Sequence, residues 1–80
     1  MFGQNEVSLI SLRKGQSGTI LKIAAGHGWA DRLSALGIIP GKKIIKVSAM
    51  LMRGPVTIQV DRTNIALGHR MASRIIVKPD

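Results

Sequence analysis

The sequence predicts a mainly β fold, a small barrel of five strands with a short helix between strands 1 and 2 and a single helical turn before the last strand. Three observations predict this class. Glycine and proline divide the chain into short segments, as in small barrels. Most segments are rich in β-branched residues or alternate apolar with polar residues, as strands do. One segment instead repeats its apolar residues at helical spacing.

The first long strand is expected at residues 18–24, which are rich in β-branched side chains and follow a turn at residues 13–15. Gly26 and Gly28 then interrupt the strand pattern, because glycine weakens a strand and favours a break.

The helix is expected next. Trp29, Leu33 and Leu36 fall at i, i+4 and i+7 and therefore share one helix face. Gly28 is the expected N-cap. Asp31 is expected in the first turn, where a carboxylate suits the positive end of the helix dipole.

The remaining strands follow the helix. They are expected at residues 43–49, 56–60, 64–67 and 74–78, with one helical turn at residues 69–72. The expected turns and breaks are at Gly37, Pro40, Gly41, Gly54, Pro55 and Gly68. Proline presets φ and glycine accepts positive φ, so Pro40-Gly41 predicts a type II turn. Closing the sheet would protect its apolar edges, which favours an SH3-like barrel.

Composition predicts a single domain over residues 1–80 with an aliphatic core. The chain has no cysteine, which excludes disulfides and thiolate metal sites. No apolar run approaches the roughly 20 residues of a membrane span, and the first residues lack the pattern of a signal peptide. A cytoplasmic protein without membrane insertion is therefore expected. The net charge of +8 favours an acidic partner, or a solvated basic surface.

Three motifs, taken in order, carry a family resemblance. They read RLxxLGxxPG at residues 32–41, GPVxIxV at 54–60 and IALGxxxAxxIxV at 65–77. The chain resembles the FeoA family of small cytoplasmic proteins of ferrous iron uptake. The resemblance implies an accessory or regulatory protein that docks onto the cytoplasmic G-protein region of the membrane iron transporter. The same barrel occurs as the C-terminal domain of iron-dependent repressors, which leaves a divalent-metal-sensing module as one alternative function.

Catalysis and a cofactor are not expected. The two histidines and four carboxylates are dispersed and form no nucleophile or general-base arrangement. The weak candidates for a divalent metal are His27 and Asp31, four residues apart, and His69 in another segment. A stable site needs more ligands than an imidazole and a carboxylate, so direct metal binding stays open.

Two surfaces are candidates for partner binding. On the helix, Trp29 and Arg32 belong to the residue types that dominate interface hot spots, although Trp29 would equally suit a cap on the core. At the hairpin, the candidates are Met50, Leu51, Met52 and Arg53. Three successive apolar residues cannot all face inward on a strand, so this hairpin either meets a partner or folds back over the barrel.

Two further alternatives concern the partner. The positive charge suits a barrel that binds nucleic acid, but single-strand binders interleave aromatic residues for stacking, and this chain has only Phe2 and Trp29. Small aliphatic barrels with exposed hairpins also self-associate, so a homo-oligomer is expected as a second kind of assembly.

Overall fold

The fold is seen in a computed structural model, which describes residues 5–49 and 54–80. The elements run β1 (Val7–Ser8), the 3-10 helix η1 (Leu9–Ser11), β2 (Ser17–Ile23), α1 (His27–Ala35), β3 (Lys43–Ala49), β4 (Val56–Val60), β5 (Thr63–Leu67), α2 (His69–Ser73) and β6 (Ile75–Pro79). The strand over residues 43–49 and the strand over 56–60 match the predicted bounds, and the others differ by one or two residues.

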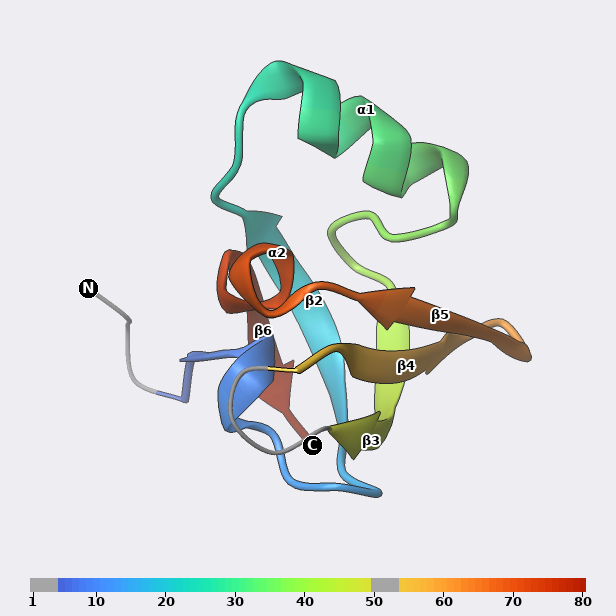
Figure 1. Ribbon diagram of the computed structural model, residues 1–80. Coiled ribbons are helices and arrows are strands. Elements are labelled where there is room, and N and C mark those ends of the chain that lie inside the picture. Colours follow the sequence, from blue (N-terminus) through green and yellow to red (C-terminus); the bar gives the residue numbers. More distant parts are fainter. Residues whose placement is uncertain (1–4, 50–53) are drawn as a thin grey trace.

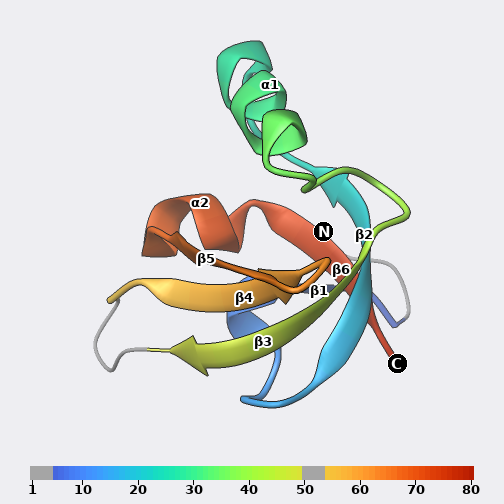
Figure 2. The same cartoon turned by 90° about the vertical axis from the view of Figure 1, so that its right-hand side faces the viewer.

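The strands form one antiparallel sheet in the order β1-β6-β2-β3-β4-β5. The sheet curls strongly, so β2 and β6 run at a steep angle to β4 and β5 (Figures 1 and 2). Register shifts between Ile20 and Lys22 and between Lys46 and Ser48 mark the bends, where a bulge increases local twist. The predicted SH3-like small barrel is confirmed. The structure adds two elements, the 3-10 helix η1 and the two-residue β1, which pairs Val7 with Val77.

The core is aliphatic, as composition predicts. In β4 the buried residues alternate with half-buried ones, so Val56, Ile58 and Val60 point inward. The side chains buried most completely are Leu9, Ile20, Ile38, Ile44, Ile58, Ile75, Val60 and Val77.

One charged residue lies among these apolar ones. Lys46 of β3 is only 4% exposed, and its Nζ donates hydrogen bonds to the carbonyl oxygens of Ile10 (2.8 Å) and Leu12 (2.7 Å). These bonds tie η1 to the sheet. Burial lowers the pKa of Lys46, because desolvation disfavours the charged ammonium.

Helix α1 begins earlier than the sequence predicts. Its N-cap is Gly26, not Gly28, because Gly26 already has the extended backbone of a cap (φ −65°, ψ 166°) and the helix starts at His27. Gly28 lies inside the helix, and the first turn contains no acidic residue. The prediction that Asp31 supports the helix N-terminus is therefore wrong.

The C-terminal end of α1 is closed by a Schellman motif. Gly37 has φ +87° and its N–H donates to the carbonyl of Ser34 (2.9 Å), while the N–H of Ile38 donates to the carbonyl of Leu33 (2.9 Å). Leu33 and Ile38 are both buried in the core. The chain therefore leaves the helix with its last carbonyls satisfied and re-enters the barrel at Ile38.

The short turns have the backbone that their residues favour. Gly41 has φ +92° after Pro40, as a type II turn requires. Asp61 and Arg62 join β4 to β5 with φ of 50° and 71°, the positive values of a two-residue type I′ hairpin. Gly68 is the N-cap of α2.

Candidate functional site: an apolar groove with an arginine rim

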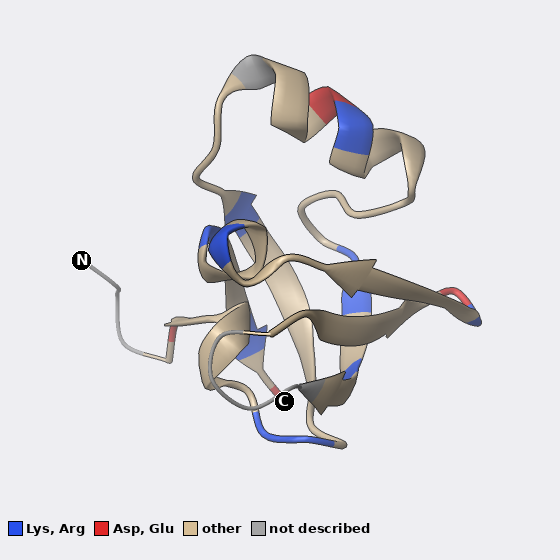
Figure 3. Cartoon of the chain, viewed as in Figure 1, with Lys and Arg blue, Asp and Glu red and all other residues tan. Residues whose placement is uncertain are grey.

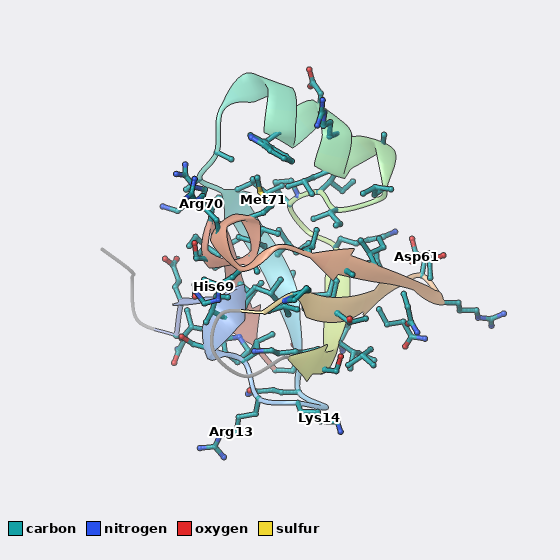
Figure 4. The ribbon with its side chains drawn as sticks, in the orientation of Figure 1. Arg13, Lys14, Asp61, His69, Arg70 and Met71 are labelled. Atoms are coloured by element: carbon teal, nitrogen blue, oxygen red, sulfur yellow. The ribbon has the colours of Figure 1, made fainter. Side chains whose placement is uncertain are left out.

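A groove of about 600 Å³ opens between α1, α2 and the end of β5. It is lined by Trp29, Arg32, Leu33, Leu36, Ala66, Leu67, Gly68, Arg70, Met71 and Arg74. In Figure 4, Met71 lies between α1 and α2, with Arg70 beside it at the same end of the molecule. Apart from the arginines, the lining is apolar or glycine, so the groove suits an apolar group.

Helix α1 supplies the upper wall of this groove, and its apolar face is divided. Leu33 is buried and holds the helix to the core. Trp29 and Leu36 are 50% and 51% exposed, although the sequence places all three on one face. The helix lies apart from the strands in both views (Figures 1 and 2). Trp29 and Leu36 therefore border the groove and do not enter the core.

Three arginines surround the apolar lining. The guanidinium of Arg32 lies 5.3 Å from the centre of the Trp29 ring, within cation–π range. Arg70 and Arg74 are four residues apart at α2, a spacing that places side chains on one side of a helical turn. All three are exposed, and the described lining contains no carboxylate. Basic residues on α1 and α2 are visible in Figure 3.

A second hollow of about 220 Å³ is lined by Gly28, Trp29 and Arg32. The indole of Trp29 and the guanidinium of Arg32 therefore border two hollows at once. The indole of Trp29 is half exposed and is not part of the buried core. The role of Trp29 as an anchor for a partner stays a prediction.

The other predicted site residues lie apart from the groove or outside the described structure. The hairpin candidates Met50, Leu51, Met52 and Arg53 fall in residues 50–53, outside the described residues. Asp31 is exposed on α1, His69 is half-buried on α2, and neither lines the groove. The side chain of His27 lies outside the described part. Within that part, no three His, Asp or Glu residues are grouped as metal ligands.

Sequence reasoning missed the lower half of the groove. Ala66 and Leu67 read as ordinary strand residues, and residues 69–72 read only as one helical turn. The available signal was the spacing of Arg70 and Arg74, which puts two cations on one side of α2 next to Met71. Their position opposite Trp29 depends on how the barrel closes, and sequence pattern does not give this.

The fold and the groove together define a class: a small basic SH3-like barrel with an open apolar groove. A family model described as the FeoA domain matches residues 7–79. The chain belongs to the FeoA family. A relative from Methanocaldococcus jannaschii, named as an Fe(2+) transport protein A, is 35% identical to this chain over 66 residues. The aligned residues are 82% of this chain and 78% of the relative.

Solved structures agree on the fold. A crystal structure of an iron uptake regulatory protein (FeoA) is 29% identical, with a TM-score of 0.86 over 94% of this chain and 99% of the other. Iron(II) transport protein A from Clostridium thermocellum is 25% identical, with a TM-score of 0.84 over 91% of this chain and 45% of the other. A manganese-dependent transcriptional repressor is 21% identical, with a TM-score of 0.85 over 94% of this chain and 42% of the repressor, and shares the fold.

Proposed function

We propose that this protein is a cytoplasmic accessory protein of ferrous iron uptake, which docks onto the cytoplasmic G-protein region of the membrane iron transporter. The observation that carries the proposal is the family match over residues 7–79, together with a relative named for Fe(2+) transport. No helix in the described part of the chain has the length and hydrophobicity of a membrane span. A place beside the transporter's cytoplasmic domain is consistent with that finding.

The groove supports docking as the mode of action. Trp29 and Arg32 form a cation–π pair at its rim, and Trp and Arg are the residue types most enriched at interface hot spots. The role proposed for the protein is binding, with the chemistry carried out by the partner.

Calorimetry against the purified G-protein domain of the transporter tests this proposal. Trp29→Ala should raise Kd at least about thirtyfold, the factor that corresponds to a hot-spot loss of about 2 kcal/mol. Ile45→Ala is the matched control, because Ile45 is also an exposed apolar residue (39%) but lies on β3, outside the groove. It should leave Kd within about twofold, since most interface-remote truncations cost little. Absence of binding by the native chain would overturn docking on this partner.

The second predicted surface, residues 50–53, is tested separately. Changing Met50, Leu51 and Met52 together to serine should weaken binding if this second predicted surface contributes. Unchanged affinity would contradict the proposed role of residues 50–53 and leave the groove as the proposed interface.

A further inference from the structure

Within the described part of the chain, strand β5 is hydrogen-bonded along one edge only. It pairs with β4 from Val56↔Leu67 to Val60↔Thr63, and it is the last strand in the sheet order. Among the described residues, no backbone hydrogen bond joins residues 63–67 to any element other than β4. The second edge of β5 is therefore open with respect to residues 5–49 and 54–80. An open edge is a template for another extended chain.

The apolar groove borders this open edge. Ala66 and Leu67 are neighbours in β5 and both line it, although successive side chains in a strand point to opposite faces. A hollow that touches both therefore lies against the edge of the strand. Figures 1 and 2 both place α1 above β5, on the side away from β4. Trp29 and Leu36 form the opposite wall.

The charge of the groove indicates which kind of partner it binds. Arg32, Arg70 and Arg74 line the groove, and none of them forms an ion pair within the described residues. A second copy of the chain also carries a net charge of +8, so electrostatic repulsion opposes self-association through this face. An acidic partner gains from the same field.

We propose that the groove binds an extended, acidic peptide segment with one bulky apolar side chain. The segment adds a strand to the open edge of β5, places its apolar side chain between Trp29 and Met71, and directs its carboxylates toward the three arginines. This inference rests on the proposed docking function and specifies the chemistry of the partner segment. Single-strand nucleic-acid binders stack successive bases on several aromatic side chains, and the groove lining includes one aromatic residue, Trp29, which favours a peptide over nucleic acid.

The test uses the full chain and a synthetic twelve-residue peptide in which Glu and Asp flank a central Leu between β-branched residues. Binding is followed by Trp29 fluorescence and by hydrogen exchange of the amides of residues 63–67. We expect saturable binding, slower exchange in β5 and at least about tenfold weaker binding by the Arg32→Gln, Arg70→Gln, Arg74→Gln triple variant.

The matched triple variant Arg13→Gln, Lys14→Gln, Lys78→Gln loses the same charge elsewhere, and Figure 4 shows Arg13 and Lys14 at the end opposite α1. It should bind within about twofold, because distant exposed charges contribute little once salt screens them.

Two altered probes make the proposal falsifiable. A peptide with Lys in place of every acid should not bind, and an acidic peptide N-methylated at alternate residues should lose binding because it cannot add to a strand. Equal binding by either probe overturns the proposal, as does preferential binding of an RNA oligonucleotide that displaces the acidic peptide. If the transporter domain binds but the peptide neither binds nor competes, this inference fails and the proposed function stands. If the peptide binds but the transporter domain does not, the proposed function fails and this inference stands.

Discussion

Lys46 illustrates a charged residue retained inside an aliphatic barrel. Its two hydrogen bonds to the carbonyls of Ile10 and Leu12 offset the desolvation that lowers its pKa. We expect Lys46→Met, which keeps the length of the side chain, to lower the free energy of unfolding by roughly 1–3 kcal/mol, because two carbonyls lose their donor. Lys46→Ala should cost more, because it also leaves a cavity. Urea denaturation measures both, and a Met variant as stable as the native chain would show that the hydrogen bonds add no net stability.

Asp80 joins two strands through its side chain. Its Oδ2 accepts a hydrogen bond from the Ser17 hydroxyl (2.8 Å) and pairs with the Lys43 ammonium (2.9 Å). Lys43, and then Ser17, hold the pKa of the Asp80 carboxyl below its usual value. Because the folded pKa is the lower one, the unfolded chain binds more protons between the two values, and this stabilisation is lost as pH falls through them.

The corresponding prediction compares Asp80→Asn with the native chain by thermal melting across pH. The native chain should have the higher Tm at every pH above about 4, the ordinary range of an aspartate. The difference should shrink and vanish at lower pH, because both chains then carry an uncharged group at this position. A Tm difference independent of pH would assign the effect to hydrogen-bond geometry instead of charge.

At the scale of elements, Gly28 within α1 and Gly37 just after its C-terminal end have opposite effects on stability. Gly37 needs a positive φ, and an added Cβ would meet only Val60 at an ordinary 3.7 Å. Gly37→Ala should therefore cost about 1–2 kcal/mol from backbone strain alone. Gly28 lies within the helix with open space around a new Cβ, so Gly28→Ala should stabilise by about 0.5–1 kcal/mol. Chemical denaturation measures both changes, and the same sign for the two would contradict this assignment of the helix end.

Local pattern predicts most of these elements, because each strand carries its own signal. Residues 56–60 alternate strictly, and Pro40-Gly41 fits only a few turn types. The two-residue β1 escapes prediction because its pairing with β6 depends on residues about 70 positions away. The start of α1 is shifted because either of two glycines suits an N-cap. In the candidate site, Trp29 and Arg32 are predictable from residue type, but their meeting with Met71 and Arg74 depends on barrel closure.

At the scale of the whole molecule, a net charge of +8 is held within 28 × 27 × 24 Å. Ion pairs among the described residues include Lys42–Asp61 and Lys43–Asp80. At 10 mM salt the Debye length of about 30 Å spans the molecule, and at 100 mM it falls to about 10 Å. Raising salt over this range should therefore raise Tm, by about 4–8 °C for each kcal/mol of repulsion that is screened in a domain of this size. The Arg13→Gln, Lys14→Gln, Lys78→Gln variant, at +5 after three cations are removed from +8, should show a smaller rise. A fall in Tm with salt would mean that the two ion pairs outweigh the repulsion among the remaining basic residues.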